Sequence, residues 1–360
     1  MDLKHNYVVG RPKLFSQERF KARVEGILES NLWGNNGPIT EELEQAYCDF
    51  TGSKYAVAVS NATVGLELVV SFSTLFRPKM RVAVPSFTFV ATASCTKRFG
   101  HEIVLIDSDW DFNIDLDHLV LEHAKNKIDL VIIPELFGNR MNHNVEELAK
   151  NLGIIVVWDR AHALGIPSSP GLAQIYSHHP TKICGGFEMG VITTNNQVLD
   201  LYLRSVRNFG FDQNSLQEAN AIYLGTNAKT SEIAAAAVLT QLEDFEPIKS
   251  HYRKIYDRYN LELKDLDNCH VNAKNTKDSN YSYVTMYAKH KARLKDFLAL
   301  RGIHTKSYFR PLHMQNEYLT KEVLFMSETL YRNLLTLPSG LHIQIEDVKM
   351  ICDKIKEFYA

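Results

Sequence analysis

Short apolar runs separated by turn residues recur through the first half of this 360-residue chain. Near-continuous valine and isoleucine over so short a run is typical of a strand covered on both faces. Helix-like stretches lie between these runs, such as VGLELVVSFSTLF and NVEELAKNL. The alternation predicts an α/β fold, with an open, mainly parallel central sheet and helices on both faces. The predicted strands are residues 55–60, 81–87, 102–107, 130–137, 154–159 and 190–195.

From about residue 229 the pattern changes to a long helical one, with Leu239, Leu242 and Phe245 at spacings of three. Pro247 should kink this helix or divide it in two. The polar stretch that follows, DNCHVNAKNTKDSN, is expected to be an exposed loop. A strand YSYVTMYA, a helix KARLKDFLALRG and a terminal helix IQIEDVKMICDKIKEFY come next. We therefore expect a large domain, residues 1–235, and a smaller C-terminal α/β domain, residues 236–360.

Composition excludes several classes of protein. The chain is 45% hydrophobic and 23% charged, as in ordinary globular proteins, and its net charge of -2 argues against nucleic-acid or anionic-membrane surfaces. The first residues carry charges where a signal peptide needs an apolar run, and no later segment is apolar for long enough to span a bilayer. Five scattered cysteines without a C-x-x-C pair suit reduced thiols. We expect a cytoplasmic protein.

Polar residues follow two of the predicted strands. Asn61, Ala62 and Thr63 come between strand 55–60 and a helix, where free backbone N–H groups could bind a phosphate. The same three residues also suit a plain helix cap, and taken alone they favour it. Asp159 ends strand 154–159, with His162 three residues later. A carboxylate there either forms a cap or an ion pair with the adjacent arginine, or faces the protonated nitrogen of a ligand.

The segment SHHPTKICGGFEMG contains Ser177 and Lys182 before the last predicted strand of the sheet. Lys182 has no charged neighbour along the chain until Glu188, and the glycines and apolar residues around it are not a solvent-facing composition. A desolvated lysine has a lowered pKa and can form a Schiff base. A phosphate cradle, an Asp for a ring nitrogen, a nearby His and a reactive lysine are together what pyridoxal 5′-phosphate requires. These residues predict that cofactor.

The chain resembles the DegT-type sugar-nucleotide aminotransferases, which are fold type I pyridoxal-phosphate enzymes, and the likeness runs along nearly its whole length. VPSFTFVATAS is similar to the family's P-x-x-T-[FW]-x-A-T run, which implies that Phe89 stacks on the coenzyme ring. DRAHALG resembles D-x-A-[HQ]-x-x-G, which implies Asp159 at the pyridine nitrogen and His162 near the ring hydroxyl. YSHHPTK resembles S-F-H-x-x-K, which implies Ser177 on the phosphate and Lys182 as the Schiff-base lysine.

Two later segments extend the resemblance. LGTNAKTSEIAAAAVLTQLE is similar to a stretch whose asparagine, here Asn227, reaches the coenzyme phosphate of the neighbouring subunit. That implies a homodimer with active sites at the interface. YFRPLHMQNEY resembles P-L-H-x-Q-x-x-Y, which makes His313 and Tyr318 candidates for touching the sugar. The alternative, that these two residues pack a domain interface, is equally open.

The activity implied by the resemblance is transfer of an amino group from glutamate to a keto-sugar nucleotide, for amino-sugar and glycan biosynthesis. FEMG resembles the F-E-G-G branch, which includes dTDP-4-amino-4,6-dideoxyglucose transaminases. That favours a dTDP-4-keto-6-deoxyhexose and C-4 over C-3. Two departures leave the substrate open, because Arg160 stands where the family usually has a small residue and His178 replaces its usual Phe.

Other functions fit these residues less well. Sugar 3-dehydratases of the family carry a histidine in place of the lysine, so Lys182 argues against that activity, and a non-catalytic regulatory relative would not need every coenzyme position filled. A zinc-dependent hydrolase could use His162, His178, His179 and Cys184, but the usual ligand spacings do not occur. A serine hydrolase lacks its G-x-S-x-G element. The residues therefore favour an aminotransferase.

Overall fold

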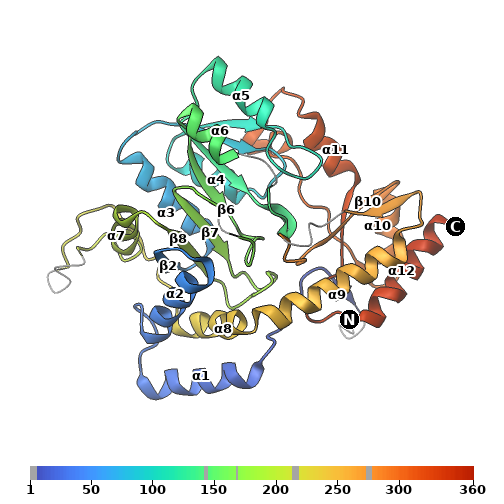
Figure 1. Cartoon of the computed structure of the whole chain (residues 1–360), viewed down its shortest axis with the longest axis horizontal. Coiled ribbons are helices and arrows are strands. Elements are labelled where there is room, and N and C mark those ends of the chain that lie inside the picture. Colours follow the sequence, from blue (N-terminus) through green and yellow to red (C-terminus); the bar gives the residue numbers. More distant parts are fainter. Residues whose placement is uncertain (1–5, 142–144, 168, 213–218, 273–277) are drawn as a thin grey trace.

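The computed structural model describes residues 6–141, 145–167, 169–212, 219–272 and 278–360. Within them a seven-stranded sheet has the order β2-β8-β7-β6-β5-β3-β4 (Figure 1). β8 runs antiparallel to both of its neighbours, and the other pairs are parallel. The predicted mainly parallel α/β sheet is confirmed. Its strands are β2 (Tyr55–Val59), β3 (Arg81–Pro85), β4 (Glu102–Ile106), β5 (Leu130–Pro134), β6 (Ile155–Asp159), β7 (Ala173–Ser177) and β8 (Gly190–Thr194).

β7 is the one strand of this sheet that the hydrophobic pattern did not predict. Its buried Gln174 and Tyr176 interrupt the apolar run that marks the other strands. Both side chains accept hydrogen bonds from the buried guanidinium of Arg160, at 2.7 and 3.2 Å. Polar atoms are tolerated inside the sheet because they are paired there. The expected alternation of strand and helix also fails here, since β6, β7 and β8 follow one another with no helix among the described residues between them.

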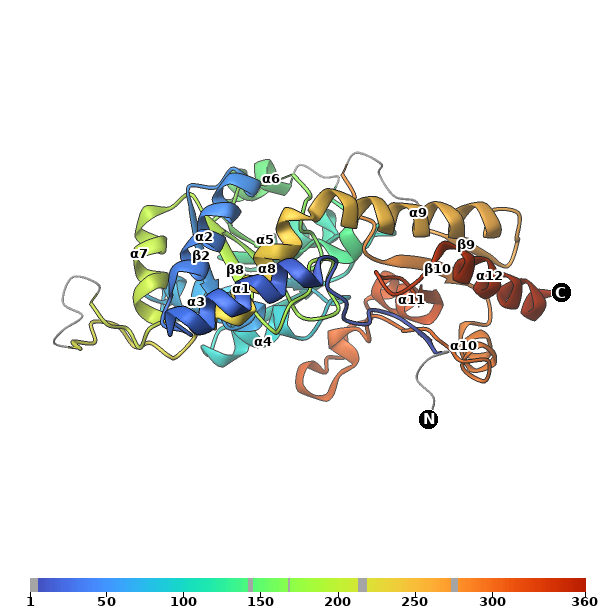
Figure 2. The same ribbon diagram turned by 90° about the horizontal axis from the view of Figure 1, so that it is seen from below.

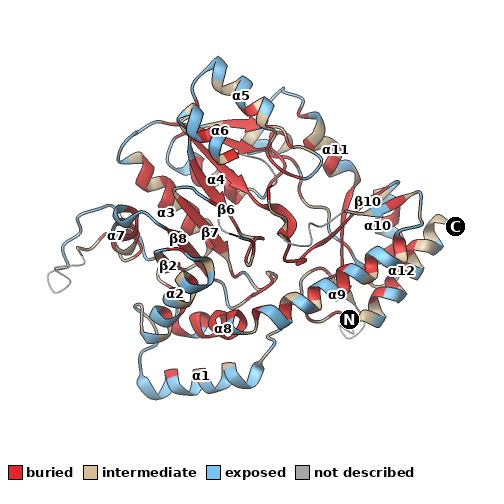
Figure 3. Cartoon of the chain, viewed as in Figure 1, coloured by how far each residue is buried: buried red, intermediate tan, exposed pale blue. Residues whose placement is uncertain are grey.

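Successive strand residues pack on opposite faces of the sheet, as the two-residue period of a strand requires. Val57 and Val59 join a buried cluster with α3 and α7, whereas Ala56 and Ala58 pack with α2 and α8 on the other face. Figure 3 shows the strands almost wholly buried and most of the helices exposed on their outer sides, whereas α8 is buried along nearly its whole length. The covering helices are α2 (Pro38–Thr51), α3 (Ala62–Thr74), α4 (Ala91–Arg98), α5 (Leu116–Lys125), α6 (Val145–Leu152), α7 (Gln197–Val206) and α8 (Glu232–Glu243).

The long helical segment is divided, as predicted from Pro247. α8 ends at Glu243 and α9 spans Phe245–Leu263, with the proline in the first turn of α9, where its missing N–H is harmless. α8 packs against α1 (Gln17–Ser30) and α2, and α9 packs against α12 (Ile345–Tyr359). The segment thus runs along both parts of the molecule (Figures 1 and 2).

The C-terminal part contains a three-stranded antiparallel sheet in the order β12-β10-β9. At the other end of the chain, β1 (Tyr7–Val8) pairs with β11 (Ile303–His304), so the N-terminal strand lies with the C-terminal elements (Figure 2). The division at residue 235 remains a prediction. The other elements of this part are β9 (Cys269–Val271), β10 (Val284–Ala288), α10 (Lys291–Ala299), α11 (Phe325–Asn333) and β12 (Leu334–Leu337).

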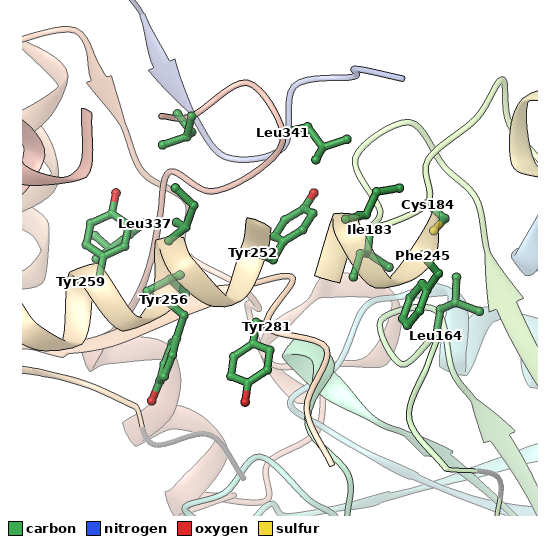
Figure 4. Packing of buried hydrophobic residues seen from close by; sticks show 14 of the residues in the cluster. Leu164, Ile183, Cys184, Phe245, Tyr252, Tyr256, Tyr259, Tyr281, Leu337 and Leu341 are labelled. Atoms are coloured by element: carbon green, nitrogen blue, oxygen red, sulfur yellow. The ribbon is translucent and has the colours of Figure 1, made fainter. Parts of the chain in front are cut away.

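A buried apolar cluster joins the two parts along α9 (Figure 4). Leu164 and Ile183, from loops at the end of the large sheet, belong to the same cluster as Tyr252 and Tyr259 of α9. The Tyr259 hydroxyl is satisfied by the Pro338 carbonyl at 2.9 Å. A shared core holds the C-terminal part in place beside the loops that follow β6 and β7.

The polar stretch before β10 is not simply an exposed loop. Cys269–Val271 forms β9, and Asn280 is fully buried, while residues 273–277 lie outside the described part. The Asn280 amide donates to the carbonyls of His162 and Leu164, at 2.8 and 2.9 Å. A polar side chain can be buried here because carbonyl groups of the loop after β6 accept its hydrogen bonds. No helix in the described residues is both long and apolar enough to cross a membrane.

Candidate active site

A cavity of about 750 Å³ lies where β5, β6 and β7 end, between the large sheet and the C-terminal part. Parallel sheets bind ligands at this end of their strands. The cavity contains residues from segments that are far apart in the sequence, from Asn61 to Phe309. Among the residues predicted from the sequence, it is lined by Ala62, Thr63, Phe89, Asp159, His162, Ser177 and Lys182.

Lys182 lies in a tight turn after β7. Its backbone N–H donates to the His179 carbonyl, and its own carbonyl accepts from Gly185. Its Nζ donates to the Tyr283 hydroxyl at 3.4 Å. Burial lowers the pKa of Lys182 to about 8, although the nearby Asp159 carboxylate opposes this by raising it. Lys182 is therefore partly an uncharged amine near neutral pH, which is what a nucleophilic lysine requires.

Asp159 ends β6 with its carboxylate facing the cavity. Thr92 donates its hydroxyl to Oδ2 at 2.8 Å, and the Ala161 backbone N–H donates to Oδ1 at 3.2 Å. Burial raises the pKa of Asp159, and these hydrogen bonds together with Lys182 act against that rise. The adjacent Arg160 pairs with Glu135 instead, so it does not provide the ion pair for Asp159 that the sequence left open. A buried carboxylate of this kind suits a cationic N–H group of a ligand.

The first turn of α3 faces the same cavity. The Asn61 side chain caps the helix by accepting the Val64 N–H at 2.9 Å, so the cap reading is correct. Asn61, Ala62 and Thr63 also line the cavity, so the cap and the phosphate cradle are compatible. Gly190 allows the main chain of β8 to lie close to the first turn of α3, because a Cβ at this position would be only 2.7 Å from the Ala62 nitrogen.

Aromatic side chains form another wall of the cavity. Phe89 lies with its ring 6.1 Å from that of Phe309, and Phe309 stacks near His162 at 6.2 Å. His162 accepts the Phe137 N–H at Nδ1, at 3.2 Å, which assigns its ring proton to Nε2. Its ring lies 4.4 Å from that of Tyr283. The wall offers flat apolar faces to a planar ligand and leaves Asp159 as the polar group at its edge.

The histidines considered for zinc do not form a metal site. His178 is fully buried, hydrogen-bonded to the Tyr47 hydroxyl through Nε2 and to the Cys184 carbonyl, rather than its thiol, through Nδ1. Burial lowers the pKa of His178 to about 4, so the ring is neutral. Across the part of the chain that the structure describes, no three His, Cys, Asp or Glu side chains are grouped to hold a metal ion.

Three predicted site residues lie away from the cavity of their own chain. Asn227 is exposed and bridges to Asn208 through its backbone. His313 is buried, with Nδ1 2.7 Å from the Ser86 hydroxyl. The Lys97 ammonium lies over the Tyr318 ring, 5.4 Å from the centre of that ring. Their predicted contacts with the coenzyme or sugar stay predictions.

Further residues line or complete the site and were not predicted, Phe309 of the aromatic wall among them. Thr92 lies within the VPSFTFVATAS run, where the resemblance could have indicated it. Glu135 follows β5 at the carboxyl end of the sheet, the edge where such residues are sought. Tyr283 and Lys306 come from the C-terminal part, and Tyr283 is 101 positions from the lysine it contacts. No local pattern in the sequence indicates that juxtaposition.

Comparison with known proteins agrees with this geometry. The DegT/DnrJ/EryC1/StrS aminotransferase family matches residues 15–356. The chain belongs to this family. It is therefore an aminotransferase, and the expected cofactor, pyridoxal 5′-phosphate, and the expected fold type I are confirmed. The alternatives of a zinc hydrolase and a non-catalytic relative are not supported.

Individual relatives are similar over most of their length. The dTDP-4-amino-4,6-dideoxy-D-glucose transaminase of Shigella dysenteriae is 28% identical over 84% of both chains. The UDP-4-amino-4,6-dideoxy-N-acetyl-beta-L-altrosamine transaminase of Campylobacter jejuni is 27% identical over 94% of both. The crystal structure of DesI in the presence of its TDP-sugar product has a TM-score of 0.90 and 29% identity, covering 99% of this chain and 93% of that one.

Proposed function

We propose that this aminotransferase transfers an amino group from glutamate to C-4 of a dTDP-4-keto-6-deoxyhexose. The observation that carries an aminotransferase site is the placement of Lys182 and Asp159 in one cavity, with the lysine pKa lowered to about 8. The sugar and nucleotide are supported by the FEMG segment, by the Shigella relative and by the TDP-sugar product named for DesI. The Campylobacter relative is named for a UDP sugar, so the nucleotide is the part that most needs a test.

The residues of the cavity suit the cofactor. The coenzyme, when bound, supplies an electron sink for the carbon that loses or gains the amino group. The N-terminus of α3, with Ala62, Thr63 and the nearby Ser177, offers N–H and hydroxyl donors to a phosphate. Asp159 would hold a proton on the pyridine nitrogen, because its carboxylate faces the cavity without an ion-pair partner among the described residues.

Lys182 would both link to the coenzyme and move protons. Its Nζ, whose pKa burial lowers to about 8 in the coenzyme-free chain, is a base that could carry a proton between two carbon atoms of a substrate. The Tyr283 hydroxyl holds that nitrogen by accepting its N–H, which limits the directions in which Lys182 can point. Phe89, Phe309 and His162 would flank the coenzyme ring and exclude water from its faces.

The lining of the cavity includes a positively charged side chain besides Lys182. Lys306 lines it, and its backbone is held by two hydrogen bonds to Thr336, at 2.8 and 3.0 Å. Its ammonium lies 5.6 Å from the Tyr308 ring centre. Both the carboxylates of glutamate and the diphosphate of a sugar nucleotide are anions, and a lysine at this place can serve each in turn.

Assays with glutamate and a panel of keto-sugar nucleotides test the proposal. We expect amination of the dTDP-4-keto-6-deoxyhexose, and none by Lys182→Ala, while Lys295→Ala, an exposed lysine of α10, keeps normal turnover. Faster turnover of a UDP or GDP sugar would refute the nucleotide assignment. Normal turnover by Lys182→Ala would refute the mechanism.

A homodimer is also part of the proposal. Asn227 is exposed and lies outside its own cavity, which is compatible with a role in the cavity of a second copy. Mixing inactive Lys182→Ala chains with Asn227→Ala chains and letting the subunits exchange should then restore activity, because one of the two shared sites is intact. Sedimentation measures the dimer itself. A monomer, or a mixture no more active than its parents, would contradict this arrangement.

A further inference from the structure

Arg160 is fully buried directly behind the cavity, at a position where the family usually has a small residue. All three nitrogens of its guanidinium donate hydrogen bonds. Nε donates to Glu135 Oε2 at 2.6 Å, and Nη2 lies 2.5 Å from the same carboxylate oxygen. Nη1 donates to Gln174 and Tyr176 of β7, and Nη2 to the Pro167 carbonyl at 2.9 Å. One side chain therefore ties together segments after β5, within β7 and after β6.

Backbone hydrogen bonds place this arrangement next to Asp159. The Glu135 N–H donates to the Asp159 carbonyl at 3.1 Å, and the Arg160 N–H donates to the Ile175 carbonyl at 2.8 Å. The two members of the ion pair thus hold, through their main-chain N–H groups, the two edges of the peptide group that follows Asp159. A shift of the main chain at either residue would be transmitted to Asp159 through this peptide group.

Arg160 also closes the loop that carries two further groups of the site. The bond from Arg160 to Pro167 joins the two ends of residues 160–167. Within this loop, the Ala161 N–H donates to Asp159, and His162 lines the cavity. Asn280 holds the same loop from the C-terminal part, through the His162 carbonyl. The loop is fixed at its base by Arg160 and near its tip by Asn280.

Stability alone is a weak reason to bury such a pair. Replacing a buried ion pair by apolar residues of similar size is often neutral or stabilising, because desolvation offsets the attraction of the charges. Removing one partner is costly, since the other charge is left unpaired. A lysine cannot replace Arg160, because an ammonium donates from a single nitrogen, whereas the guanidinium reaches acceptors on separate segments from three nitrogens. The geometry is that of a positioning device.

We propose that Arg160 and Glu135 form a buried clamp that positions Asp159 and the 161–167 loop against the coenzyme. The inference rests on the proposed role of Asp159, and on nothing about the sugar. Arg160 is a positioning residue, since it lies behind the wall of the cavity and acts through Asp159 and His162. Glu135 lines the cavity and holds the Arg160 guanidinium. Replacing both residues together should therefore affect coenzyme binding and the catalytic step more than folding.

The test compares Arg160→Met, Arg160→Lys and the double variant Glu135→Leu/Arg160→Met. Arg258→Met is the matched control, because Arg258 pairs with Glu262 on α9 away from the cavity. For each protein the unfolding midpoint, the coenzyme dissociation constant, kcat and KM for glutamate are measured. The coenzyme dissociation constant is obtained by absorbance titration with pyridoxal 5′-phosphate, and needs no sugar substrate.

We expect Arg160→Met to lose both stability and coenzyme affinity. The double variant should recover the unfolding midpoint, but keep a dissociation constant about tenfold higher and a kcat about 10- to 100-fold lower, with KM little changed, as for misplaced catalytic groups. Arg160→Lys should resemble Arg160→Met in coenzyme affinity, and Arg258→Met should change the midpoint only. Recovery of coenzyme affinity and kcat in the double variant would overturn the proposal, as would normal coenzyme affinity in Arg160→Lys. Failure of the dTDP assignment would leave the coenzyme measurement unaffected.

Discussion

The reactivity of Lys182 follows directly from its surroundings. A pKa of about 8 leaves roughly a quarter of its amine uncharged at pH 7.5, against about one in a thousand for a lysine at 10.5. Burial is the main cause, while Asp159 raises this pKa and Lys306 lowers it. Asp159→Asn should therefore move the titration of Lys182 to lower pH, and Lys306→Met should move it to higher pH.

Competitive acetylation of the coenzyme-free protein over pH 6–11, followed by mass spectrometry of its peptides, measures each lysine separately. We expect a midpoint near pH 8 for Lys182. Lys291 is an internal control, because burial lowers its pKa to about 8 as well, but it lies outside the cavity. Its midpoint should not respond to either substitution.

Two results would refute this reasoning. A midpoint near 10.5 for Lys182 would show that the amine is solvated and that its reactivity does not come from burial. Shifts in the same direction for Asp159→Asn and Lys306→Met would show that the charges of the cavity do not act on Lys182 as the geometry requires. Equal movement of Lys291 would indicate a general change in the fold.

Two further predictions concern groups that support the site. Thr92→Val removes a hydrogen bond that lowers the pKa of Asp159, so this pKa should rise, and coenzyme should be lost at a higher pH on acid titration, measured as coenzyme retained after gel filtration. His178 has its pKa lowered to about 4, so the unfolded chain binds more protons than the folded one between pH 4 and 6.5, and stability falls as pH drops through that window. His178→Phe should remove up to about 3 kcal/mol of that loss, measured by urea unfolding at pH 7 and pH 4.5.

Each of these has a contradicting outcome. An unchanged acid limit of coenzyme retention in Thr92→Val would mean that the hydroxyl does not stabilise the Asp159 carboxylate. An equally steep fall of stability with acid in His178→Phe would place the responsible proton on another group. At pH 7 the phenylalanine variant leaves the Tyr47 hydroxyl without its partner, so the comparison is between slopes with pH and not between absolute stabilities.

Much of the large sheet could be predicted because its information is local. Six of its strands are continuous apolar runs, and burial on both faces leaves little else that such runs can form. The cap at Asn61 and the divided helix at Pro247 also rest on short stretches of sequence. The placement of Lys182 and Asp159 in one cavity follows from the rule that ligands bind at strand ends. Residues at the carboxyl ends of parallel strands lie at the same edge of the sheet, whatever the conformation of the loops between the strands.

Long-range contacts account for what was missed. β7 did not look like a buried strand because Gln174 is polar, and one of the hydrogen bonds that Gln174 makes inside the sheet comes from Arg160, at the end of another strand. Tyr283 reaches Lys182, and Asn280 reaches the His162 loop, from a part of the chain that has no local signal for either contact. Whether such a polar side chain is buried depends on a partner that the neighbouring residues do not specify.

Periodic hydrophobicity, strand ends and turn chemistry were thus enough to predict the α/β architecture and to name the lysine, the aspartate and the helix start that line one cavity. Folding in three dimensions assigned the partners: Glu135 to Arg160, Thr92 to Asp159, Tyr283 to Lys182. The reason is physical, since burial is largely a property of a residue and its neighbours along the chain, whereas a hydrogen bond or an ion pair needs two groups that are brought together only when distant segments pack.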